Sequence, residues 1–186
     1  MSATLIIPGF KGSEAGHWQR QWLEDDDNAQ IVEQDDWHYP VLSEWLYKLE
    51  AKLVENPGAV LVAHSLGCIL VSHLSGRPAA SHVAGALLVA PADAETMAKK
   101  DARFASFAPL PREQLSFPSI VVASRNDEYM SFNKAQALSK LWGTGFIDLG
   151  FSGHINPASG FHHWPEGAIL AAGLHNAQPE QQLRAG

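Results

Sequence analysis

The chain has 186 residues, of which 46% are hydrophobic, and a formal net charge of −7 from 20 acidic and 13 basic residues. This length suits one domain around a single core, and no apolar run approaches the ~18 residues that a membrane-spanning helix needs. The acidic balance argues against nucleic acid or an anionic membrane surface as a partner, because neither attracts a negatively charged protein.

Segments of strand and helix character alternate along the chain. In order they are strand 4–8, helix 16–24, strand 30–34, helix 42–55, strand 59–64, helix 66–76, strand 83–90, strand 119–124, helix 131–142, strand 145–149 and helix 164–174. The strands are short and apolar, and the helices show apolar residues at three- and four-residue spacing. Residues 87–89 and 120–122 are apolar consecutively, as expected when helices cover both faces of a parallel sheet.

This alternation predicts an α/β fold, a doubly wound parallel sheet of six strands between two helical layers, with right-handed crossovers. We expect a single domain over residues 1–175 and a flexible polar tail over 176–186. Segment 91–118 is harder to interpret, and its Pro109, Pro111 and Pro118 indicate a loop or short helix over the carboxyl edge of the sheet. There it would form part of a lid or a pocket wall.

Cysteine content and the amino terminus bear on the compartment. One cysteine, Cys68, cannot form an internal disulfide, which fits a reducing environment. The apolar stretch 5–7 has no positive charge before it and runs straight into Pro8-Gly9, so it is too short for a signal peptide. We therefore expect a cytoplasmic protein.

Residues 59–67, Ala-Val-Leu-Val-Ala-His-Ser-Leu-Gly, have the layout of a nucleophile elbow. A serine on a sharp strand-to-helix turn has a strained backbone, so the positions two before and two after it must be small. Ala63 and Gly67 meet that demand, although the usual pattern has glycine at both. Ser65 is therefore the candidate nucleophile.

A serine hydroxyl needs a histidine to take its proton and a carboxylate to orient that histidine. In hydrolases built on a sheet of this kind, the three follow in the order serine, acid, histidine, each after a successive strand. Asp127 follows the fifth predicted strand and His154 follows the sixth, in a glycine-rich loop. Asp127 is the candidate acid, with Glu128 and Asp148 as rivals, and His154 is the candidate general base. His64 leaves the strand on the opposite side from Ser65, so we expect it to support the elbow.

Attack on an acyl carbonyl creates an oxyanion, which requires hydrogen-bond donors fixed in advance. The amide of Leu66, at the start of the helix after the elbow, is one candidate. The second is expected from the loop after the first strand, at Phe10 or Lys11. Substrate specificity would then depend on nearby loops, and Trp37, Ile155 and Trp164 are candidate pocket residues.

Taken together, these motifs resemble the small serine hydrolases that include the retinoblastoma-binding protein and its bacterial YdeN-like relatives, over about residues 4–172. The resemblance is carried by Pro8-Gly9, His17-Trp18 with Trp22, residues 36–40, His64-Ser65-Leu66-Gly67, the Asp127 loop, and Gly153-His154 with Asn156. It implies a minimal six-stranded α/β-hydrolase fold, a triad of Ser65, Asp127 and His154, and no metal or organic cofactor. The Leu-x-Cys-x-Glu sequence linked to retinoblastoma-protein binding is absent, because Ile69-Leu70 follow Cys68.

Other functions remain open at this stage. The chain could be an esterase of small acyl esters, or a hydrolase-like scaffold that binds proteins and has lost its activity. A lipase would need a wide apolar acyl site, for which the chain is short. Cys68 as nucleophile lacks an elbow, and a metal site at His154 with His162 and His163 lacks the usual ligand spacing.

Overall fold

The computed structural model describes residues 2–176, and its centre is a six-stranded sheet in the order β2-β1-β3-β4-β5-β6. All neighbouring strands are parallel. The strands are β1 (Thr4–Ile7), β2 (Ala29–Ile31), β3 (Ala59–His64), β4 (Val83–Val89), β5 (Ser119–Ala123) and β6 (Gly145–Asp148). The predicted parallel α/β sheet is thus confirmed, and β2 differs most from its predicted bounds because it ends after three residues.

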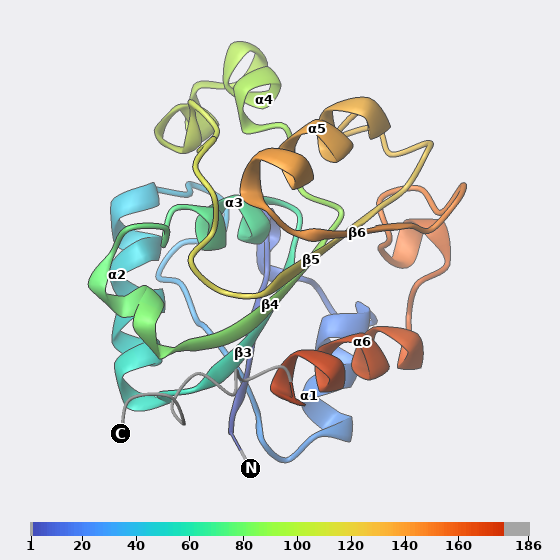
Figure 1. Cartoon of the computed structure of the whole chain (residues 1–186). Coiled ribbons are helices and arrows are strands. Elements are labelled where there is room, and N and C mark those ends of the chain that lie inside the picture. The colour runs from blue at the N-terminus through green and yellow to red at the C-terminus, as the bar shows by residue number, and fades with distance from the viewer. Residues whose placement is uncertain (1, 177–186) are drawn as a thin grey trace.

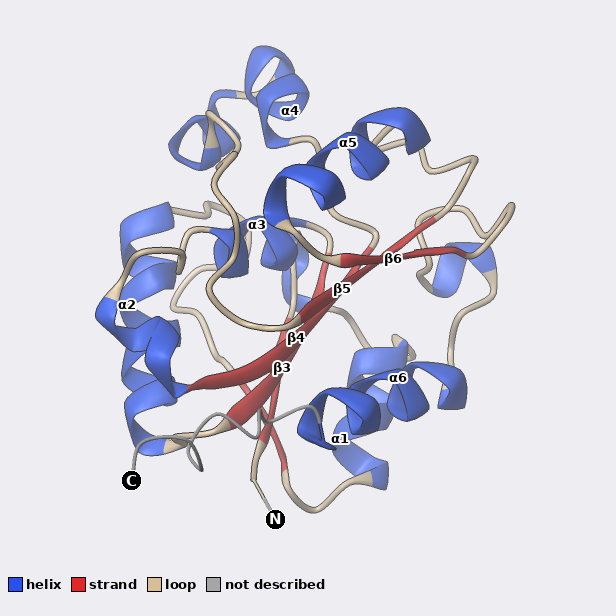
Figure 2. Ribbon diagram, in the orientation of Figure 1, coloured by secondary structure: helices blue, strands red, loops and turns tan. Residues whose placement is uncertain are grey.

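Helices cover both faces of this sheet (Figures 1 and 2). The α-helices are α1 (Trp18–Asp25), α2 (Leu42–Glu55), α3 (Leu66–Ser72), α4 (Ala94–Lys100), α5 (Phe132–Trp142) and α6 (Pro165–Asn176). Short 3-10 turns are η1 (Phe10–Gly12), η2 (Pro78–His82), η3 (Ala102–Phe107) and η4 (Pro157–Ser159). In the views of Figures 1 and 2, α1 and α6 lie on one side of the sheet, and α2, α3 and α5 lie on the other.

The alternation of side chains along each strand divides the core into two layers. Leu61 of β3 joins the larger layer, which α2 closes with Trp45 and Leu49. Val62 points the other way into a smaller layer, which is closed by Trp18 of α1 and by Trp164, the residue before α6. Every residue of β3 is buried, which explains why its sequence is apolar almost without interruption.

Segment 91–118 contains more helix than the sequence predicts. Asp93 caps α4 by accepting the amide hydrogen of Thr96, and Asp101 caps η3 by accepting that of Arg103. Each helix is too short to show a clear helical period. In Figure 1, α4 lies beyond α3, above the upper ends of the central strands.

Strand order determines where a site can form. From β1 the chain crosses to β2 on one side, and after α2 it returns to β3 on the other side. The segments that follow β1 and β3 therefore diverge, and this reversal opens a crevice at the carboxyl ends of the two strands. Ser65 lies directly after β3, at this crevice.

Within residues 2–176, no helix combines the length and the apolar character needed to cross a membrane. The tail predicted over 176–186 lies outside the described residues, except for Asn176, which ends α6.

Candidate active site

Ser65 occupies a backbone conformation that few residues adopt. Its φ is 56° and its ψ is −122°, between the end of β3 and the first residue of α3. A side chain in this region costs on the order of 1–3 kcal/mol, which the surrounding structure must offset. The turn projects the hydroxyl from the edge of the sheet, as the elbow pattern predicts.

Two glycines make room for this turn. A Cβ atom at Gly67 would clash with the carbonyl oxygen of Ile7 and would lie 2.7 Å from that of Pro8. A Cβ atom at Gly9 would lie 2.9 Å from the Cβ of Ser65. The loop after β1 therefore contacts the elbow directly, and only glycine fits on either side of that contact.

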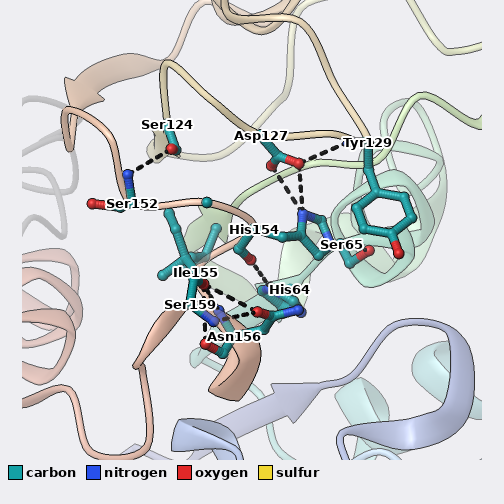
Figure 3. Close-up of polar contacts among 12 residues, drawn as sticks. His64, Ser65, Ser124, Asp127, Tyr129, Ser152, His154, Ile155, Asn156 and Ser159 are labelled. Atoms are coloured by element: carbon teal, nitrogen blue, oxygen red, sulfur yellow. Dashed lines mark hydrogen bonds and ion pairs between the residues drawn. The ribbon is translucent and has the colours of Figure 1, made fainter.

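The three predicted triad side chains form one continuous chain of hydrogen bonds (Figure 3). The Nε2 atom of His154 lies 2.9 Å from the Oγ atom of Ser65, and its Nδ1 atom lies 2.9 Å from both carboxylate oxygens of Asp127. The carboxylate can only accept, so Nδ1 carries the proton and Nε2 is free to accept one from the serine hydroxyl. The His154 and Asp127 side chains are only 7% and 3% exposed.

Polar side chains tie the loop of Asp127 to the loop of His154. The amide oxygen of Asn126 accepts the backbone N–H of Gly153 at 2.8 Å and the hydroxyl of Ser124 at 2.9 Å. Ser124 in turn accepts the backbone N–H of Ser152 at 2.9 Å. The sequence analysis missed these contacts, because nothing in the sequence indicates which loop the Asn126 side chain meets.

The rival acids lie elsewhere. Asp148, the last residue of β6, accepts hydrogen bonds from the guanidinium of Arg125 at 2.6 and 2.8 Å. Glu128 is exposed, and the backbone N–H of Tyr129 goes to Asp127 rather than to Glu128. Only Asp127 among these three carboxylates contacts the His154 imidazole in the described part of the chain.

Two backbone amides near Ser65 are free for an oxyanion. Those of Leu66 and Phe10 have no backbone acceptor among residues 2–176, whereas the amide of Lys11 donates to the carbonyl of Trp37 at 3.0 Å. The helical dipole of α3 is also directed at this point. The geometry therefore favours Phe10 over Lys11 as the second donor.

Ser65 and His154 open onto a cavity of about 760 Å³. One wall comes from η1 and the following loop with Phe10 and Lys11, and another from α4 and η3 with Met97 and Phe104. Tyr129 and residues 156–158 complete the lining. Segment 91–118 therefore supplies a wall of the pocket.

None of the three predicted pocket residues is among those that line this cavity. Trp37 packs beneath Gly12 and edge-on against Trp45, with 5.5 Å between ring centroids. Ile155 is fully buried, because its backbone turns with φ 48° and its side chain joins the layer between β-sheet and α6. Trp164 packs against Trp18 and lines a separate cavity between α1 and α6.

Three imidazoles lie in a row beneath the site. The ring centroid of His64 is 4.8 Å from that of His154 and 4.8 Å from that of His17. Burial, followed by repulsion from His154, lowers the pKa of His17 to about 4 and holds the pKa of His64 well below its ordinary value. The rings of His17 and His64 are therefore neutral at pH 7.

Cys68 and the distal histidines take no part in this geometry. Cys68 is buried, donates to the carbonyl of Val89, and has its thiol pKa raised by burial, so it is poorly suited to act as a nucleophile. His163 pairs with Asp25 at the surface, and His162 contacts the carbonyl of Gly16. Within residues 2–176, no group of three potential ligands is arranged to hold a metal ion.

Comparison with known proteins shows the family to which the chain belongs. The serine hydrolase family model matches residues 4–172. No curated protein sequence matches the chain. A YdeN-like hydrolase from Pectobacterium atrosepticum is 30% identical with a TM-score of 0.81, over 95% of this chain and 92% of that one.

Two more distant structures share the fold. The ydeN gene product of B. subtilis is 21% identical with a TM-score of 0.74, over 95% of this chain and all of that one. A Bacillus cereus carboxylesterase is 15% identical with a TM-score of 0.62, over 95% of this chain and 89% of that one. The chain belongs to the serine hydrolase family of the YdeN type, on the α/β-hydrolase fold.

Proposed function

We propose that this protein hydrolyses small acyl esters through Ser65, His154 and Asp127, with an acyl-enzyme intermediate on Ser65. The observation that carries the proposal is the position of the His154 imidazole, within 2.9 Å of both the hydroxyl that it would deprotonate and the carboxylate that would orient it. Family membership supports the hydrolytic class of reaction. The ester substrate is our inference from the pocket and the nucleophile.

In the first half of the cycle, Nε2 of His154 takes the Ser65 proton as Oγ attacks the ester carbonyl. The amides of Leu66 and Phe10 stabilise the oxyanion, which is worth about 3–4 kcal/mol for one such donor in other hydrolases. His154 then donates the same proton to the leaving alcohol. Asp127 stays ionised and stabilises the imidazolium.

In the second half, water occupies the place of the alcohol. His154 accepts a proton from this water as its oxygen attacks the acyl carbon, and the acid product leaves when Ser65 regains its proton. Apart from the ester and one water molecule, no group outside the chain is needed to balance these steps. The cavity of about 760 Å³ has room for a small ester, and its lining combines aromatic residues with charged ones.

The proposal is tested by covalent labelling and turnover. The purified protein is incubated with a fluorophosphonate probe, and the labelled residue is identified by mass spectrometry of the peptides. Modification of Ser65, together with hydrolysis of p-nitrophenyl acetate, is the expected result. A folded protein that neither reacts nor hydrolyses the ester would instead favour a role as a protein-binding scaffold.

A further inference from the structure

Two buried side chains hold the backbone of the candidate base from below. The Nε2 atom of His64 lies 2.9 Å from the carbonyl oxygen of His154, and the indole Nε1 of Trp18 lies 2.8 Å from the carbonyl oxygen of Ile155. The exposed fractions of His64 and Trp18 are 5% and 1%. Figure 3 shows His64 beneath the His154 backbone, on the side away from Asp127.

The direction of both hydrogen bonds is fixed by chemistry. A carbonyl oxygen can only accept, and an indole nitrogen can only donate. Nε2 of His64 must therefore carry the ring proton, so a single tautomer of His64 makes this contact. The two donors meet consecutive carbonyls, which leaves the peptide between His154 and Ile155 little freedom to rotate.

The backbone that they hold is strained. Ile155 has a φ of 48°, which is an outlier for a β-branched residue, and Gly153 on the other side of His154 has a φ of 56°. A backbone in this conformation persists only where surrounding contacts over-determine it. Conformational relaxation at Ile155 would rotate the attached His154 and move its imidazole away from Ser65.

Further rings fix the positions of the two donors. Trp18 packs edge-on against His64, with 5.9 Å between ring centroids, and His17 packs against the same imidazole from another side. His64 also directly precedes Ser65 in the chain. Its hydrogen bond therefore links the backbone of the nucleophile elbow to the backbone of the base.

We propose that Trp18 and His64 form a clamp on the carbonyls of residues 154 and 155 that sets the position of the His154 imidazole relative to Ser65. They are positioning residues, since neither touches the reacting atoms. The inference rests on the proposed function, because it explains how the proposed base is held.

The indole donor is tested with Trp18→Phe, which keeps an aromatic ring and removes the N–H group. The matched control is Trp22→Phe, because Trp22 lies in the same core layer and its indole makes no hydrogen bond within residues 2–176. A displacement of about 1 Å at a reacting group can cost about 100-fold in rate. We expect Trp18→Phe to lower kcat for p-nitrophenyl acetate about 10- to 100-fold with little change in KM, while Trp22→Phe stays near wild type.

The imidazole donor is tested with His64→Leu and His64→Gln. Leucine removes the donor, whereas the glutamine amide can return an N–H group close to the position of Nε2. We expect His64→Gln to retain at least about ten times the kcat of His64→Leu. Circular dichroism and thermal melting confirm that each variant is folded, and kcat is calculated per folded molecule.

A second readout separates this inference from the proposed function. The Nδ1 proton of His154, between the imidazole and Asp127, is followed by its downfield proton resonance in wild type and variants. Loss or shift of that resonance in Trp18→Phe and His64→Leu supports the clamp even if wild type proves inactive. Wild-type kcat in both folded variants, or an unchanged resonance where wild type is inactive, overturns it.

Discussion

The Nε2 atom of His154 and the Oγ atom of Ser65 lie 2.9 Å apart, although 89 positions separate the two residues in the chain. The parallel sheet produces this contact, because β3 and β6 both end at the same edge and deliver their following loops to it. The elbow then projects the serine upward, and the loop of residues 149–154 returns the imidazole over it. Each of these steps can be tested separately.

Replacing Ser65 by alanine should abolish turnover of p-nitrophenyl acetate and labelling by a fluorophosphonate. Loss of the nucleophile lowers kcat by about a million-fold in a well-studied serine hydrolase. The Cβ atom remains, so the fold should be unaffected. Ser81→Ala, which changes an exposed serine whose hydroxyl donates to the carbonyl of Pro78, is the control and should retain full activity. Undiminished esterase activity of Ser65→Ala would contradict the assignment.

The strain at Ser65 leads to a prediction about stability. Glycine tolerates a φ of 56° without a Cβ clash, so Ser65→Gly relieves a cost of about 1–3 kcal/mol. The greater conformational freedom of glycine in the unfolded chain lowers the stability of Ser65→Gly by roughly 0.5–1 kcal/mol and offsets part of this gain. We expect Ser65→Gly to unfold at higher urea than Ser65→Ala. The reverse order would mean that the elbow stores little strain.

Replacing Asp127 by asparagine should lower kcat about 10,000-fold, because the amide favours the wrong imidazole tautomer. The two rivals give the controls. Asp148→Asn weakens the ion pair with Arg125 and keeps a side-chain oxygen that can accept the N–H of Gly150, and Glu128→Gln changes an exposed side chain with no bond to the imidazole. Both should keep kcat within about tenfold of wild type. If kcat fell strongly in one of these two variants and only mildly in Asp127→Asn, the residue changed in that variant would be the acid of the triad.

A methyl group at Gly9 should impair catalysis by steric means alone. Gly9 has a φ of −92°, which any residue can adopt, but its added Cβ would lie 2.9 Å from Ser65 Cβ and 3.0 Å from the amide nitrogen of Leu66. The amides proposed for the oxyanion would be pushed apart. We expect kcat to fall about 100- to 1,000-fold, as when one oxyanion donor is lost.

The matched control for that change is Gly173→Ala, in α6. Among residues 2–176, no atom other than those of its chain neighbours and of the backbone of α6 itself lies within 4 Å of the added methyl group, and alanine is the better helix former by roughly 0.5–1 kcal/mol. This variant should be slightly more stable and fully active in the same assays. If Gly9→Ala behaved like Gly173→Ala, the loop after β1 would have no part in the oxyanion site.

The sequence predicted those features of the fold and site that depend on the ends of strands. Ser65, Asp127 and His154 each follow an apolar run, and the parallel sheet brings such positions together whatever the details of the loops. The direction of a loop side chain is a different matter. Ile155 was expected in the pocket, yet its backbone turns it into the core, and that turn depends on contacts with Trp18 and His64 that are distant in sequence.

Segment 91–118 is a second case in which the structure depends on contacts that are distant in sequence. Its prolines correctly indicated a break in regular structure, but the pocket wall formed by Met97 and Phe104 depends on short capped helices without a visible period. Their position depends on an ion pair between Lys134 of α5 and Asp93, with 2.6 Å between Nζ and Oδ1. A single sequence does not reveal which distant residue completes such a pair.

The buried imidazole of His17 predicts a loss of stability in mild acid. Its pKa is about 4 in the folded protein against about 6.5 when unfolded, so the unfolded state binds the additional proton between these values. The contribution of the neutral His17 ring to the free energy of unfolding is fully present above pH 6.5. It is lost as the pH falls toward 4, by about 3 kcal/mol in total. His64, whose pKa is also lowered by burial, adds to the loss in the same direction.

Urea unfolding at a series of pH values between 4 and 7.5 measures this effect. The informative variant is His17→Asn, because the asparagine oxygen can replace Nδ1 as the acceptor for Gln19 N–H at the start of α1 and cannot titrate. We expect its free energy of unfolding to fall less steeply with decreasing pH than that of wild type. Parallel slopes for wild type and His17→Asn would show that the His17 ring is protonated as readily in the folded as in the unfolded chain.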